Sequence, residues 1–166
     1  MTSFKTEDLL RAARGVMKQA DYCFFISHGR GGEIHSRLMH PFEPEDDFTI
    51  WLGASPDSRK AQEIRNNNHV TLSYMNPRTT GYVTILGTAT LENSIDLRYK
   101  YWRAYWSDMY PGGPENMDYI LIKVVPHRIE MMNFEESALP QPYGLKPVGL
   151  ARKDKEWSLI ESANEL

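Results

Sequence analysis

Residues 82–92 read YVTILGTATLE and form the longest strand pattern in the chain. Residues at even positions are mostly polar or aromatic, whereas residues at odd positions are aliphatic or small. This period of two is typical of a β-strand, whose successive side chains point to opposite faces. Gly87 interrupts the pattern, and a glycine inside a strand marks a bulge or the close approach of another group. We therefore predict a long strand with an irregularity at Gly87.

Shorter strand patterns lie on both sides of this stretch. Turns rich in glycine, proline and asparagine separate them, and the glycines of HGRGGE at 28–33 suit a hairpin. Pro126 would confine the last strand to a sheet edge or interrupt it. The predicted strands are YCFFIS at 22–27, IHSRLMH at 34–40, FTIWLG at 48–53, HVTLSYM at 69–75 and YILIKVV at 119–125. These short antiparallel strands favour a mainly β fold, a small β-barrel with a few helices, over a sandwich or a parallel α/β sheet.

Helical patterns are few. Thr6 and Ser94 are expected to act as N-caps of the first and third helices. In the third helix Trp102 and Trp106 lie four residues apart, so we expect their rings to stack on one face. The expected helices cover residues 6–19, 58–67 and 95–109.

The chain divides at one point by composition. Residues 1–138 are expected to form a single barrel domain, which a chain of 166 residues can build around its own core. From Leu139 the sequence changes to a proline- and glycine-rich linker, followed by a hairpin pattern around KDKE at 153–156. We assign residues 139–166 to a C-terminal extension.

Composition excludes some classes of partner. The net charge of −3 provides no overall field that would attract nucleic acid. No stretch approaches the roughly 20 apolar residues that a membrane span needs, and the first residues are too charged for a secretory signal. We therefore predict a soluble, cytoplasmic protein.

Its only cysteine, Cys23, is flanked by aromatic residues, and we expect a buried, inert thiol.

The stretch SPDSRKAQEIR at 55–65 carries the strongest chemical pattern. Arg59 and Lys60 fall in the first turn of a predicted helix, where the helix dipole disfavours cations. Together with the hydroxyl of Ser58 they suit a phosphate monoester. The alternative is a solvated turn whose charges pair with Asp57 or Glu63, and the spacing alone leaves both open.

Arg37, in the second predicted strand, is the next candidate. If the second and third strands paired, Arg37 could reach the same anion as Arg59 and Lys60; otherwise it is an exposed strand cation. His28, His35 and His40 lack the cysteine, carboxylate or helical spacing that would complete a metal site, so no metal is predicted. No nucleophile elbow is present, and no catalytic residue is assigned.

At this point the sequence resembles the pyridoxamine 5′-phosphate oxidase-like FMN-binding split barrels, and most closely their general stress protein branch. The resemblance covers roughly residues 6–134. It rests on HSRLM, FTIWLGASPDSRKAQEIRNNNHVTLSY, YVTILGTATLE and the W…YPGGPE segment, in that order. It implies a six-stranded antiparallel split barrel that forms a homodimer, with FMN bound at the subunit interface.

The resemblance also implies roles for individual residues. Three of them would line the flavin from the second strand, two would touch the isoalloxazine ring from the third strand, and three would bind the phosphate. Tyr82 would be a polar cofactor contact, and Trp106 would reach the flavin of the other subunit. The first three groups are Arg37, Leu38 and Met39; Leu52 and Gly53; and Ser58, Arg59 and Lys60.

Two departures bear on the reaction. HRIEMM is followed by NFEESALPQP instead of the oxidases' Arg-Leu-His type signature, and Met132 replaces a tryptophan common there. The resemblance therefore argues against oxidation of pyridoxamine phosphate itself. It favours an FMN-binding, flavin-dependent oxidoreductase, with NAD(P)H as an electron donor to be considered. The alternatives are a non-catalytic FMN or FAD carrier or stress sensor, and a barrel that binds another ligand such as haem or a deazaflavin.

Overall fold

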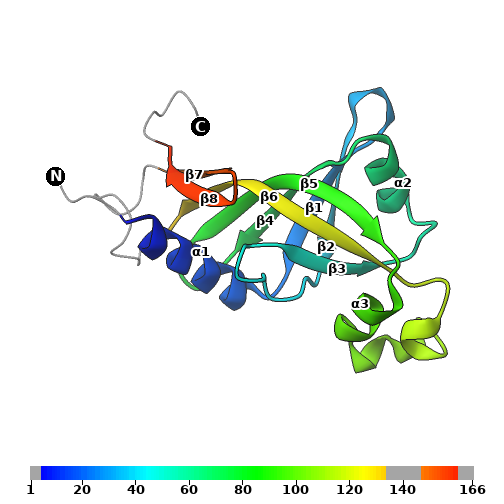
Figure 1. Cartoon of the computed structure of the whole chain (residues 1–166). Helices are drawn as coiled ribbons and strands as arrows, with labels where there is room; N and C mark the ends of the chain where they lie inside the picture. The colour runs from blue at the N-terminus through cyan, green and yellow to red at the C-terminus, as the bar shows by residue number, and fades with distance from the viewer. Residues whose placement is uncertain (1–4, 134–146, 161–166) are drawn as a thin grey trace.

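The computed structural model describes residues 5–133 and 147–160, and within them an antiparallel sheet with three α-helices and three short 3-10 helices (Figure 1). In chain order the elements are α1 Thr6–Ala20, β1 Cys23–His28, η1 Arg30–Gly32, β2 Ile34–Met39, β3 Ile50–Ala54, α2 Arg59–Asn66, β4 His69–Met75, β5 Tyr82–Glu92, α3 Ile95–Lys100, η2 Ala104–Asp108, η3 Gly113–Glu115, β6 Ile120–Met132, β7 Val148–Lys153 and β8 Glu156–Leu159.

The strands form one sheet in the order β2-β1-β4-β5-β6-β7-β8, and β3 pairs with β6. Every pairing in the described chain is antiparallel. β2 pairs only with β1, and β3 only with β6, so the barrel is open between β2 and β3 within the described residues. The predicted mainly β barrel class is confirmed.

The predicted irregularity at Gly87 is a β-bulge. Leu86 pairs with Arg128, whereas Gly87 pairs with Pro126, so His127 is the extra residue of β6. A Cβ on Gly87 would lie 2.7 Å from the carbonyl oxygen of Val125, which explains the glycine. The bulge also accommodates Pro126, and β6 therefore continues through it to Met132.

The sheet has eight strands, so the expected number of six is wrong. β7 and β8 form a hairpin around Asp154 and Lys155, and β7 pairs with the second half of β6. Hydrogen bonding along β6 thereby extends the sheet beyond the six expected strands. The expected domain boundary at 138/139 lies outside the described residues.

The third expected helix is also wrong in its length. α3 ends at Lys100, Tyr101 leaves helical geometry at φ −106° and ψ 48°, and a separate 3-10 helix follows at Ala104–Asp108. The ring of Tyr101 stacks on Trp51 of β3 at 4.8 Å, and its hydroxyl donates to Glu45. These tertiary contacts end the helix.

Ser94 is the N-cap residue of α3 but makes no side-chain capping bond, and the N-cap of α1 is Lys5, not Thr6.

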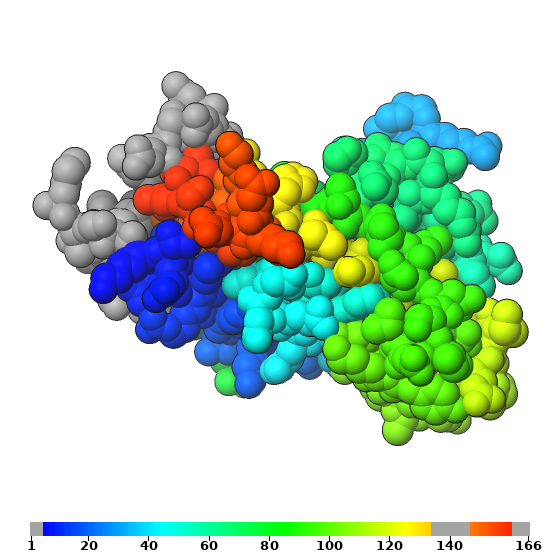
Figure 2. Space-filling model, in the orientation of Figure 1, coloured from blue at the N-terminus to red at the C-terminus, as the bar shows by residue number. Residues whose placement is uncertain are grey.

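Apolar side chains form two clusters on opposite sides of β3. Ile50, Leu52 and Ala54 face the barrel core, which α1 helps to cover. Trp51 and Tyr119 belong to a second, aromatic cluster beneath the segment between β5 and β6. That segment forms a lobe beside the barrel (Figures 1 and 2, light green to yellow). Because successive side chains of β3 point to opposite faces, one face of the strand packs in the barrel core and the other in the aromatic cluster.

In the aromatic cluster the expected stacking of Trp102 on Trp106 is wrong. Their ring centroids are 5.8 Å apart with planes at 84°, an edge-to-face contact. The two residues lie on different sides of the break at Arg103, the N-cap of the 3-10 helix, so helical spacing no longer applies to them.

Cys23 is buried as expected, and burial raises the pKa of its thiol to about 12. The thiol is therefore protonated and inert at neutral pH. None of the helices in the described part of the chain is long and apolar enough to cross a membrane.

Candidate functional site: a cation cluster at the start of helix α2

Helix α2 begins without a side-chain cap. Its N-cap residue, Ser58, has an extended backbone, and its Oγ donates to the carbonyl of Ser55 at 2.7 Å instead of accepting from the helix. The first N–H groups of a helix have no partner within the helix. This end of α2 therefore offers donors and a positive dipole end next to Arg59 and Lys60.

The side chain of Glu63, one turn further on, is only 7% exposed. It faces the hairpin formed by β1 and β2, because its carboxylate contacts Ser27 of β1 and His35 of β2. Its carboxylate accepts hydrogen bonds at 2.5 Å from Ser27 Oγ and from His35 Nδ1. The sequence had offered Glu63 only as an ion-pair partner on a solvated turn.

Arg37 reaches the same carboxylate from β2. Its Nη2 lies 3.1 Å from Glu63 Oε2, and its Nη1 donates to Ser27 Oγ at 2.5 Å. The pairing of the second and third strands that was considered for Arg37 does not occur, because β2 pairs with β1 in the predicted hairpin. Arg37 approaches α2 by another route: it stands opposite Phe25 on the inner face of the hairpin, and α2 packs against β1.

Arg59 and Lys60 complete the cation cluster, which we define as Arg37, Arg59 and Lys60. Arg59 Nε lies 3.6 Å from Glu63 Oε1, and its side chain is 64% exposed. Burial lowers the pKa of Lys60, the positive charge of Arg37 lowers it further, and the charge of Glu63 raises it. With one carboxylate among three cations, the cluster keeps two net positive charges.

Glu63 is ionised in this setting. Burial by itself raises its pKa, but hydrogen bonds from Ser27, His35 and Arg37, together with the charge of Arg37, lower the pKa below the ordinary glutamate value. An ionised carboxylate only accepts hydrogen bonds, so His35 donates from Nδ1. The Glu63 carboxylate is therefore an acceptor in all three of these hydrogen bonds, from Ser27, His35 and Arg37.

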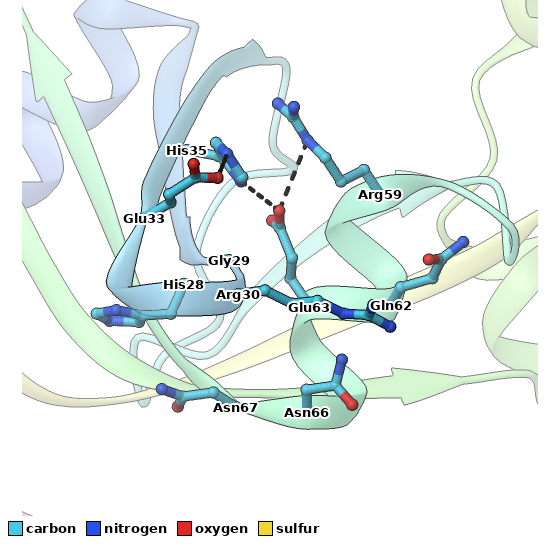
Figure 3. A pocket seen from close by; sticks show the side chains of 10 residues that line it. All are labelled: His28, Gly29, Arg30, Glu33, His35, Arg59, Gln62, Glu63, Asn66 and Asn67. Carbon is cyan, nitrogen blue, oxygen red and sulfur yellow. Dashed lines mark hydrogen bonds and ion pairs between the residues drawn. The ribbon is translucent and has the colours of Figure 1, made fainter.

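A cleft of about 760 Å³ lies between the hairpin tip and α2 (Figure 3). The hairpin tip is light blue and α2 is blue-green in Figure 2. Figure 3 shows the Glu63 carboxylate directed toward His35 and Arg59. Gly29 allows this arrangement, since a Cβ there would lie 2.6 Å from the His35 ring. The cleft is lined by His28, Gly29, Arg30, Glu33, His35, Arg59, Gln62, Glu63, Asn66 and Asn67.

The other predicted site residues lie apart from this cluster. Leu38 is 60% exposed on the opposite face of β2, and Met39 packs partly against the barrel core. Leu52 is fully buried in that core. A Cβ on Gly53 would lie 2.6 Å from the ring of Trp106, so this ring covers the outer face of β3. The contacts predicted for these residues with a flavin stay predictions.

Tyr82 lies far along β5 from the contact that β5 makes just after the end of α2, and Trp106 is enclosed within its own chain. Tyr82 is the first residue of β5. The contact between β5 and the segment just after α2 is made seven residues later, where the N–H of Ala89 donates to the carbonyl of Asn68. Seven residues of strand span roughly 23 Å. Trp106 is 7% exposed and packs within the aromatic cluster of its own chain. Its predicted reach into another subunit stays a prediction.

Metal ligands do not gather anywhere in residues 5–133 and 147–160: no three His, Cys, Asp or Glu side chains there could hold an ion together. Of the three histidines considered from the sequence, His35 binds Glu63, and His40 contacts Tyr105 and Asp21. The site is therefore a cluster of cations with one carboxylate, Glu63, among them.

The comparison with protein families agrees with this fold. A family model described as "Pyridoxamine 5′-phosphate oxidase like" matches residues 8–141. The chain belongs to the pyridoxamine 5′-phosphate oxidase-like family. The family expected from the sequence is thereby confirmed. The chain is also similar to general stress protein 26 of Bacillus subtilis (strain 168): the two are 32% identical over 108 residues, which cover 63% of this chain and 75% of the relative.

Solved structures of the pyridoxamine 5′-phosphate oxidase-like family share the fold. A protein related to general stress protein 26 from Clostridium acetobutylicum superposes with a TM-score of 0.75 at 14% identity, over 92% of this chain and 100% of that one. A pyridoxamine 5′-phosphate oxidase-related, FMN-binding protein from Nostoc punctiforme superposes with a TM-score of 0.72 at 15% identity, over 95% and 96%. At these identities the likeness establishes the architecture.

Proposed function

We propose that this chain binds FMN and that Arg37, Ser58, Arg59 and Lys60 hold its phosphate. The observation that carries the proposal is the gathering of three cations at the uncapped start of α2. Two net positive charges match the charge of a phosphate monoester, which is close to −2 at neutral pH. A helix N-terminus supplies further N–H donors to the same anion.

The residues present fit the phosphate better than they fit the ring. Leu52 is buried in the core and Trp106 covers Gly53, so β3 offers a ring its main-chain edge, not its side chains. Within residues 5–133 and 147–160, the edge of β2 next to Arg37 has no paired strand. We therefore propose that the isoalloxazine ring lies along the opening between β2 and β3. The Nostoc relative, which is described as FMN-binding, supports the choice of FMN over FAD.

We further propose that the protein is a flavin-dependent oxidoreductase. Bound flavin supplies the electron-transfer chemistry, and the protein contributes binding, orientation and exclusion of water. No side chain is assigned as an acid or base. Pyridoxamine phosphate is not the proposed substrate, because Met132 and the segment after it depart from the oxidase signature. NAD(P)H is the proposed electron donor.

The assembly that we propose is a homodimer with flavin at the interface. An exposed apolar face supports it: Phe24, Ile34, Leu38 and Met75 are each at least 53% exposed. Strand pairing places them on one face of the sheet, since residues paired across strands point the same way. Large exposed apolar patches of this kind mark association sites. A cytoplasmic location stays a prediction.

Titration with FMN and with riboflavin tests the proposal. The purified protein is expected to show a flavin absorbance spectrum, or to quench the fluorescence of added FMN, and to bind FMN at least about tenfold more tightly than riboflavin. Anaerobic mixing with NADPH or NADH then measures flavin reduction. A protein that binds neither flavin contradicts the whole proposal. Bound flavin that NAD(P)H does not reduce contradicts the donor and favours a carrier.

A further inference from the structure

Glu63 is the one carboxylate in contact with the cation cluster among the described residues. Its two oxygens contact Arg37 Nη2 at 3.1 Å and Arg59 Nε at 3.6 Å. Lys60 makes no side-chain hydrogen bond to it in the described structure. Two of the three cations proposed for the phosphate are therefore already engaged by an anion of the protein itself.

The remaining contacts of Glu63 keep its carboxylate in place. Ser27 and His35 both donate to it, and His35 is held against Gly29 on the hairpin. Arg59, in contrast, is 64% exposed, and its 3.6 Å contact with Glu63 is the longest of those that the carboxylate makes with its partners. An incoming phosphate would thus recruit Arg59 and Lys60 while Glu63 stays nearby. A carboxylate so close to a phosphate dianion repels it.

We propose that Glu63 is the internal counterion of the phosphate site: in the free protein its carboxylate pairs with Arg37 and Arg59 and offsets one of the cluster's three positive charges, and it limits how tightly a phosphate-bearing ligand binds. This inference rests on the proposed function and deepens it, because it assigns to the site a built-in limit on affinity. One unit of like charge within roughly 7 Å of a dianion, in a solvent-exposed site, corresponds to about a tenfold change in affinity.

The substitution Glu63→Gln removes the charge and keeps an oxygen that accepts from Arg37 and Ser27. We expect it to tighten FMN binding about tenfold, measured by fluorescence titration, and to leave riboflavin binding within about twofold. A merely structural role would change both flavins alike. The matched control is Glu33→Gln, because Glu33 also lines the cleft and contacts His35 but none of the cations. We expect that variant to bind FMN as the wild type does, within about twofold.

Inorganic phosphate provides a readout that does not depend on flavin. The expected result is a larger rise in thermal midpoint with added phosphate for Glu63→Gln than for the wild type. If the Gln variant does not fold, Glu63→Asp withdraws the carboxylate from Arg37 and Arg59 by one methylene. We then expect FMN to bind about threefold more tightly.

The outcomes separate this inference from the proposed function. Unchanged or weaker FMN binding in the Gln variant, or in the Asp variant where that one is used, overturns the inference while FMN binding by the wild type upholds the function. A wild type that binds no flavin contradicts the function. In that case the phosphate comparison still decides the role of Glu63, and equal thermal shifts in both proteins refute it.

Discussion

Arg37 Nη2 donates a 3.1 Å hydrogen bond to Glu63 Oε2, and this contact joins strand β2 to helix α2. The two residues are 26 positions apart, and both side chains are largely buried, at 20% and 7% exposure. A buried ion pair needs good geometry and further hydrogen bonds to repay its desolvation. Ser27 makes one such bond with each partner: its hydroxyl accepts from Arg37 and donates to Glu63. These bonds hold the two side chains in place at one side of the site.

Replacing Arg59 and Lys60 together by Ala is expected to weaken FMN binding about a hundredfold and riboflavin binding less than about threefold, because only FMN carries a phosphate. Fluorescence titration measures both. The control is Arg11→Ala with Lys18→Ala, which removes the same charge from the exposed side of α1. Equal losses for the two flavins would mean that Arg59 and Lys60 act through folding.

Stability is expected to fall in acid partly through Glu63. Its pKa is lower in the folded protein than in the unfolded chain, so the unfolded chain binds more protons as the pH drops and stability rises with pH. The contribution is complete above the ordinary glutamate pKa of 4.5 and disappears as the pH falls through the lower folded value. Urea unfolding of wild type and Glu63→Gln should differ by about 2 kcal/mol at neutral pH and converge in acid. A gap that does not depend on pH would contradict this.

Much of the fold was predictable because local patterns agree with tertiary structure. HVTLSYM coincides with β4, and Gly87 marks the bulge, since alternation and a strand glycine are local signals. The break after Lys100 was not predictable, because Tyr101 is held by contacts with Glu45 and Trp51, which lie about 50 residues away. Long-range packing overrides helix periodicity there.

The cations of the candidate site were predictable from the sequence, whereas the role of its carboxylate, Glu63, was not. The unusual position of Arg59 and Lys60 at a helix start is visible in the sequence. The role of Glu63 depends on how the hairpin folds over α2 and brings Ser27 and His35 to the carboxylate. The one local signal for it was its spacing, because Glu63 follows Arg59 at i+4 on the same helix.

Gly87→Ala is expected to destabilise the protein by about 2–3 kcal/mol, since the added Cβ would meet the carbonyl of Val125 at 2.7 Å. Main-chain atoms on the paired strand cannot move aside as a side chain can. Gly15→Ala is the matched control: nothing lies within 4 Å of a Cβ there, and the residue is inside α1. It should stabilise the protein by about 0.5–1 kcal/mol, and chemical denaturation distinguishes the two signs.

Cys23 is expected to resist thiol reagents in the native protein. Its side chain is buried, and a pKa of about 12 leaves almost no thiolate at about pH 8. A chromogenic disulfide reagent should label the thiol only after unfolding in urea, with a rate that follows the population of the unfolded form. Rapid labelling of the folded protein would show that β1 opens locally.

The apolar face of β1, β2 and β4 gives the last prediction. Phe24→Glu places a charge opposite Leu38, in the middle of that face, and should convert the proposed homodimer to a monomer in light scattering. Because flavin is proposed to lie at the interface, FMN binding should weaken together with dimerisation. Met117→Glu is the control, since Met117 is 73% exposed on the aromatic lobe and should change neither property. If the wild type is a monomer and still binds FMN, the cofactor site does not depend on a subunit interface. If the Phe24→Glu variant remains a dimer, the interface lies on another face of the protein.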